Sequence, residues 1–182
     1  MKSIFTGIVL SLFVLMGNHG YAASKYKRSL DKKVGAYLQS GVVIGGRVGK
    51  GYTLINVRRN FAKKESLERV VLDMGDLKGK PILGEMSYFH VSIEQKPSRA
   101  VIDLSQVGRS GVDQDKLYRI FKKSPLIKSA EITYDPEDAT TNLVLNFYRP
   151  TKVEVFQLSS PDSPSRIVLD MKPIKIEPRR KG

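Results

Sequence analysis

Hydrophobic and polar residues alternate along most of the chain after residue 51, in runs rich in β-branched and aromatic side chains. Alternation with a period of two is typical of strands that bury one face. It predicts eight strands separated by turn-forming residues, at 52–58, 68–74, 87–94, 99–104, 127–134, 142–148, 152–158 and 166–171. The glycine-rich run at 41–51 predicts a first strand with flexible turns. The expected fold class is therefore all-β, a β-sandwich with one short helix.

One stretch alone has helical spacing. Leu117, Ile120 and Phe121 follow one another at i, i+3 and i+4, which places them on one face of a helix over residues 113–123. Asp113 suits the N-cap position, because its carboxylate can accept a hydrogen bond from a free backbone N–H of the first turn.

A short pattern recurs along the chain: Arg, apolar, Val, apolar, Asp, apolar. Three complete copies occupy residues 69–74, 99–104 and 166–171, and a weakened copy at 142–147 has asparagine in place of both charged residues. An alternating strand and a Pro-Ser pair precede two of the copies. The sequence therefore predicts one four-stranded unit present twice, at 54–104 and 126–171, with the helix at 113–123 between them.

Strand geometry gives the pattern two interpretations. Arg99 and Asp103 face the same side of a strand but lie about 13 Å apart, so they cannot pair with each other. They can pair with a neighbouring strand that carries the same motif and so fix the register. Alternatively, the charged face binds a ligand, because guanidinium and carboxylate groups hydrogen-bond sugars and carboxylates. Including two aromatic residues that could stack on a sugar, the candidate ligand-binding residues are Arg69, Asp73, Arg99, Asp103, Arg166, Asp170, Tyr88 and Tyr148.

The N-terminus has the form of a secretory signal peptide. Lys2 precedes an apolar run at residues 4–16, and Gly20-Tyr21-Ala22 has the small-x-small form of a cleavage site. We place the cut after Ala22, with an alternative one residue later; an uncleaved anchor is the competing interpretation. The run is too short to cross a bilayer comfortably as a helix. The expected localisation is periplasmic, with no transmembrane segment after cleavage.

Charge and composition limit the classes of molecule that the protein can be expected to bind. The chain has 31 Lys and Arg residues against 18 Asp and Glu, a formal net charge of +13, and no cysteine. Disulfides and thiol chemistry are therefore excluded. An exported basic protein meets wall polymer or lipid headgroups rather than nucleic acid. A basic, glycine-rich leader is expected at 23–51 and a basic tail at 174–182.

The sequence gives little support for an enzyme. After signal removal His90 is the one remaining histidine, whereas a catalytic zinc site usually needs three protein ligands. His90 is interpreted as a sheet residue, and no Gly-x-Ser-x-Gly motif is present. The aspartates belong to a repeated pattern, which favours an architectural role over one asymmetric active site. We therefore expect no catalytic residue, no metal site and no cofactor.

These motifs resemble the AMIN domain, a localisation module of periplasmic N-acetylmuramoyl-L-alanine amidases and pilus secretins. The resemblance covers residues 53–173 and rests on two ordered rounds of strands, at 69–74, 88–93 and 97–104, then at 141–147, 153–158 and 164–171. It implies two four-stranded sheets packed as a symmetric sandwich, which here would span residues 52–173. It also implies that the protein is exported and attaches to peptidoglycan or to an envelope machine. Asn142 and Asn146 depart from the pattern, and the insert at 77–86 is longer than its partner.

The leading hypothesis is a non-catalytic periplasmic module that binds peptidoglycan or another anionic envelope polymer. The alternative is a protein-interaction component of an envelope assembly, such as a type IV pilus or secretion machine. A third hypothesis is binding of anionic lipid through residues 24–33 and 178–181.

Overall fold

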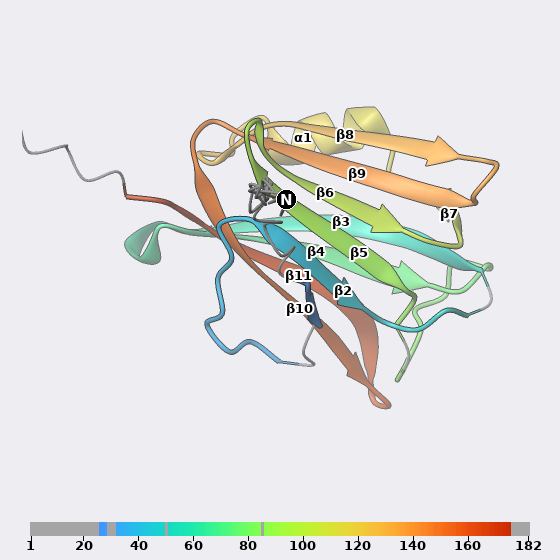
Figure 1. Cartoon of the computed structure of the whole chain (residues 1–182). Helices are drawn as coiled ribbons and strands as arrows, with labels where there is room; N and C mark the ends of the chain where they lie inside the picture. Colours follow the sequence, from blue (N-terminus) through green and yellow to red (C-terminus); the bar gives the residue numbers. More distant parts are fainter. Residues whose placement is uncertain (1–25, 29–31, 50, 85, 176–182) are drawn as a thin grey trace, which may run out of the picture.

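The computed structural model describes residues 26–28, 32–49, 51–84 and 86–175. Within these residues the chain forms two β-sheets packed face to face, with one short helix along one side (Figure 1). The mostly β prediction is confirmed. The expected signal peptide and residues 176–182 of the expected tail lie outside the described residues.

Sheet A contains, in spatial order, β1 (Tyr26–Arg28), β2 (Gly41–Gly45), β5 (Phe89–Gln95), β6 (Ser98–Leu104), β9 (Thr140–Phe147) and β8 (Ile127–Asp135). Sheet B contains β10 (Thr151–Ser160), β11 (Ser163–Pro173), β4 (Leu67–Gly75), β3 (Tyr52–Ala62) and β7 (Val107–Ser110). Neighbours are antiparallel except β1 with β2 and β3 with β7. A one-turn 3₁₀ helix, η1 (Lys63–Glu65), connects β3 to β4.

The eight strands predicted from alternation all form, with ends displaced by a few residues. The glycine-rich run also supplies β2, which pairs with β5, so the sandwich begins before residue 52. The sheets are wider than the expected four strands because β1 and β2 extend sheet A and β7 extends sheet B. The predicted units are not the sheets: each sheet takes one hairpin from residues 54–104 and another from 126–171.

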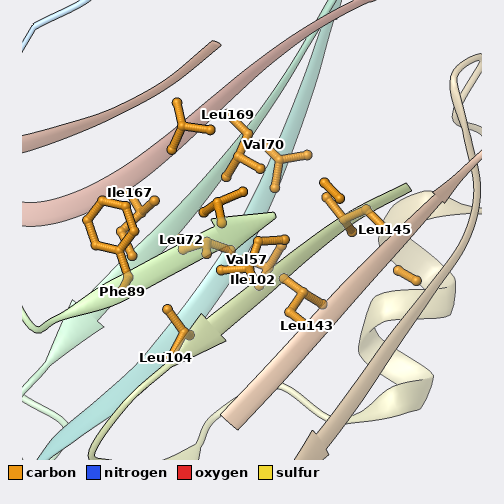
Figure 2. Close-up of a cluster of buried hydrophobic side chains, with 14 of the residues drawn as sticks. Val57, Val70, Leu72, Phe89, Ile102, Leu104, Leu143, Leu145, Ile167 and Leu169 are labelled. Carbon is orange, nitrogen blue, oxygen red and sulfur yellow. The ribbon is translucent and has the colours of Figure 1, made fainter. Parts of the chain in front are cut away.

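The core lies between the sheets and is built from alternate residues of the strands (Figure 2). Leu72 of β4 and Leu169 of β11 face Ile102 of β6 and Leu143 of β9, and all four are fully buried. Each buried side chain of this kind contributes roughly 1.5–3 kcal/mol. Because successive side chains of a strand point to opposite faces, this burial turns the intervening Arg and Asp residues outward.

The helix α1 (Gln114–Phe121) forms where the spacing predicted it. Asp113 is its N-cap, and its carboxylate accepts a hydrogen bond of 2.7 Å from the backbone N–H of Lys116. Leu117 and Phe121 are buried in the shared core. None of the described helices is long and apolar enough to span a membrane.

A side chain of α1 covers part of the free edge of sheet A. The amide of Gln114 donates to the carbonyl of Ala130 at 2.7 Å and accepts from the N–H of Ile132 at 3.2 Å. It thus takes the hydrogen-bonding positions that a further strand would use beside β8.

Candidate functional site

The outer face of sheet B brings together four of the predicted site residues. Strands β4 and β11 are antiparallel neighbours, with Arg69 directly opposite Asp170 and Asp73 directly opposite Arg166. Between these two charged rows, Val71 lies opposite Val168. We call these six residues, together with Arg58 of β3, the ladder face.

Asp170 is the most constrained charge of the ladder face. Its side chain is fully buried, and it accepts hydrogen bonds of 2.6 and 2.8 Å from the guanidinium of Arg69 and contacts the Lys33 ammonium at 2.6 Å. Burial alone would raise the pKa of this carboxyl, but the hydrogen bonds from Arg69 and Lys33 outweigh it and lower the pKa below its ordinary value. The same bonds raise the pKa values of Arg69 and Lys33.

Asp73 holds the other row. Arg58 donates two hydrogen bonds of 2.7 Å to the two oxygens of this carboxylate, and they raise the pKa of Arg58. Arg166 approaches the same carboxylate at 3.4 Å from its Nε, an atom that is buried and has no hydrogen-bond partner. A third of the Arg166 side chain is nevertheless exposed. Arg166 is therefore the arginine of this face with the most unused donor capacity.

A depression of about 390 Å³ lies over this part of sheet B. Its lining consists of Arg58, Arg59, Asn60, Arg69, Val71, Leu158, Arg166 and Val168. Val71 and Val168 come from the middle of their strands, and Leu158 lies near the end of β10. Such a surface can hold a ligand that has apolar parts and carries carboxylate or hydroxyl groups.

The segment before β2 crosses one side of the ladder face. The backbone N–H groups of Val34 and Ala36 donate to the buried carboxylate of Glu154, at 2.8 and 3.1 Å. Leu38 exchanges two backbone hydrogen bonds of 2.8 Å with Val153. This attachment brings Lys33 to Asp170, so the segment adds a second cation to the row of Arg69 and Asp170.

The outer face of sheet A is different, although it carries the copy of the motif at 99–104. Arg99 pairs within its own hairpin with Glu94 at 2.8 Å, and Asp103 pairs likewise with His90 at 2.8 Å. The neighbouring strand β9 places Asn146 opposite Arg99 and Asn142 opposite Asp103. His90 is a sheet residue, as predicted, and its Nδ1 has a carboxylate partner.

The two aromatic candidates lie at opposite ends of sheet A. Tyr88 is half-buried in the segment just before β5, and Tyr148 follows the last residue of β9 with 60% of its surface exposed. The eight predicted residues therefore do not form one cluster: four of them share the ladder face, and Arg99 and Asp103 lie together on sheet A.

Sequence reasoning missed Lys33 and Arg58 as members of this face. Lys33 is distant in sequence and lies in a segment without alternation, so no local signal could have assigned it. Arg58 carried a usable signal, because it was the last residue of the predicted strand at 52–58, which in the structure continues to Ala62.

Glu68 was also missed as a structural residue. It is fully buried at the start of β4 and binds the guanidinium of Arg59, the hydroxyl of Ser124 at 2.7 Å and the N–H of Leu126 at 3.3 Å. Its contacts join sheet B to the segment that follows α1.

Among the described residues, no group of three or more His, Asp or Glu side chains is placed to hold a metal ion. No protein-family model matches the chain, and no curated protein matches it at a significant level.

Proposed function

We propose that this chain is an exported, non-catalytic, AMIN-like module that binds peptidoglycan through the ladder face. Peptidoglycan offers carboxylates on its peptide stems and hydroxyl and acetamide groups on its sugars. These groups complement guanidinium donors arranged around an apolar floor. The form of the N-terminal sequence supports export to the periplasm.

Arg166 is the observation that carries the proposal. Arg69 donates two short hydrogen bonds to Asp170 and Arg58 donates two to Asp73, whereas Arg166 has one long contact. On the adjacent strand β10 its direct neighbour is Leu158, while Arg99 of sheet A has Glu94 in the corresponding place. Arg166 is therefore the guanidinium to which a ligand carboxylate can bind without displacing a close partner.

The order of the strands supports the AMIN-like assignment. In chain order, β3, β4, β5 and β6 of residues 54–104 correspond to β8, β9, β10 and β11 of residues 126–171. When each strand is replaced by its counterpart, the order β5-β6-β9-β8 of sheet A becomes β10-β11-β4-β3, which is the order of sheet B without β7. A duplicated unit would produce this relation, and the doubled motif in the sequence agrees with it.

A single substitution tests the site. Leu158→Glu would give Arg166 the partner that Arg99 already has, and it would place a negative charge in the depression. We expect the wild-type protein to pellet with purified sacculi at low salt and the variant to bind at least about tenfold more weakly, through the loss of one charge-assisted contact. Unchanged circular dichroism would show that the fold persists.

Glu94→Leu is the matched control, because it frees Arg99 on the other sheet and should leave pelleting unchanged. Equal binding by the wild type and Leu158→Glu would refute the role of the ladder face. A protein that stays wholly in the supernatant, yet is cross-linked to a partner protein in cells, would favour the alternative of an envelope-assembly component.

A further inference from the structure

Several turns of the two sheets meet at one end of the sandwich, on the left in Figure 1. They are the β3–β4 turn at 63–66, the β5–β6 turn at 96–97, the segment after α1 at 122–126 and the β9–β10 turn at 148–150. Hydrogen bonds link neighbouring segments: Arg59 donates to the carbonyl of Lys123 at 3.2 Å, the N–H of Tyr148 to the carbonyl of Leu126 at 3.0 Å, and Ser98 to the carbonyl of Arg149 at 3.1 Å. The turns therefore form one continuous surface.

This surface, which we call the basic end, carries eight exposed cations. They are Lys63, Lys64, Lys96, Lys122, Lys123, Lys128, Arg149 and Lys175. None of the eight forms an ion pair within the described part of the chain. Glu65 is the exposed carboxylate of these turns, whereas Glu68 is buried and already engaged. The chain leaves this end at Lys175, and Arg179, Arg180 and Lys181 follow in the sequence.

The opposite end of the sandwich has a different charge balance. Its described loops and strand ends carry four cations and five carboxylates: Arg47, Lys78, Lys80 and Arg109, with Asp76, Asp135, Glu137, Asp138 and Asp162. The excess positive charge of the protein is thus concentrated at one pole rather than spread evenly. Such a field orients the molecule toward an anionic surface.

We propose that the basic end docks on the surface of an anionic lipid bilayer. Six of its cations lie in the four segments named above, Lys128 is the second residue of β8, and Lys175 follows β11. None of the eight lines the depression over sheet B. Seven of the eight are lysines, which act as point charges in diffuse attraction, whereas recognition of one planar group favours arginine. Tyr148 at the same end is 60% exposed, and tyrosine has an amphipathic ring that suits the headgroup region.

This proposal uses residues other than those of the ladder face, so it stands independently of peptidoglycan binding. It also differs from the lipid-binding hypothesis drawn from the sequence, which assigned that role to residues 24–33 and 178–181.

Vesicle sedimentation tests the docking surface. The protein, purified as the cell produces it, is mixed with vesicles of equimolar phosphatidylglycerol and phosphatidylcholine, or of phosphatidylcholine alone. We expect binding to the anionic vesicles only, weakening as salt is added. Replacing Lys63, Lys64, Lys122 and Lys123 by Gln should weaken it more than about a hundredfold, at about fivefold for each lysine near the surface.

The matched control replaces Arg47, Lys78, Lys80 and Arg109 by Gln, which removes the same charge from the opposite end. It should retain most of the binding, and sacculus pelleting should be similar for both quadruple variants. If both variants lost vesicle binding equally, net charge and not the basic end would explain the binding, and the proposal would be overturned. Binding of duplex DNA as tight as that of anionic vesicles, with the same loss pattern, would assign the surface to a soluble polyanion instead.

Discussion

The two outer faces of the sandwich carry the same sequence motif and use it differently. On sheet B two Arg/Asp strands are neighbours, so each charge meets its opposite across the strand pair. On sheet A the Arg/Asp strand lies beside one that has asparagine at both positions, and its charges pair within their own hairpin. The comparison teaches that the neighbouring strand, and not the motif, decides whether a guanidinium is held or left available.

The degree of burial separates the faces further. The side chain of Asp170 on sheet B is fully buried, whereas that of Asp103 on sheet A is 33% exposed. Water therefore screens the Asp103 pair more than the Asp170 pair, and Asp170 also has more partners.

The largest expected effect compares these two carboxylates directly. Asp170→Asn removes the charge that Arg69 and Lys33 share, and we expect it to lower the free energy of unfolding by about 3 kcal/mol. Asp103→Asn should cost less than about 1 kcal/mol, since its pair with His90 is solvated. Urea denaturation of both variants measures the difference. Equal losses would show that burial does not distinguish the faces.

A second test uses acid. The pKa of Asp170 is lowered in the folded protein, so its contribution to stability is present above its unfolded pKa of about 3.9 and is lost as pH falls through the lower folded pKa. The urea concentration at the unfolding midpoint of the wild type should therefore decrease as the pH is lowered below about 4. In Asp170→Asn the midpoint should decrease less in this acidic range, whereas in Asp103→Asn it should decrease as in the wild type. If the midpoint of Asp170→Asn decreased with acid as steeply as that of the wild type, Asp170 would not be the cause of the decrease.

The smallest effect comes from rebuilding the ladder on sheet A. Asn142→Arg places a cation opposite Asp103 and should stabilise the fold by about 0.5 kcal/mol. Asn146→Asp, which looks equally favourable from the motif, should destabilise by a similar amount. The reason is that Asn146 now donates a hydrogen bond of 3.1 Å to Glu131, and a second carboxylate there would be repelled. Thermal melting at low salt resolves the opposite signs.

Much of this architecture could be read from local patterns. The strands formed where β-branched residues alternate, and the helix began at its predicted cap. The charge pairing of Arg69 with Asp170 and of Asp73 with Arg166 followed from a motif that complements itself when two copies run antiparallel.

Other features depend on contacts that no local window contains. Strand β7 has four residues with only Val107 buried, too few to produce alternation. Glu68 resembled an exposed residue at a strand end, and its burial depends on Arg59, Ser124 and Leu126 from other segments. The position of Lys33 depends on where the segment before β2 attaches to β10.

The amide of Gln114 has a consequence for how this protein associates with copies of itself. A nine-residue edge strand with open backbone groups is a template on which another chain can add, and repeated addition leads to fibres. Here one side chain satisfies a donor and an acceptor in the middle of that edge. Gln114 therefore hinders the addition of another strand beside β8, which opposes polymerisation of a strand-rich chain at high concentration.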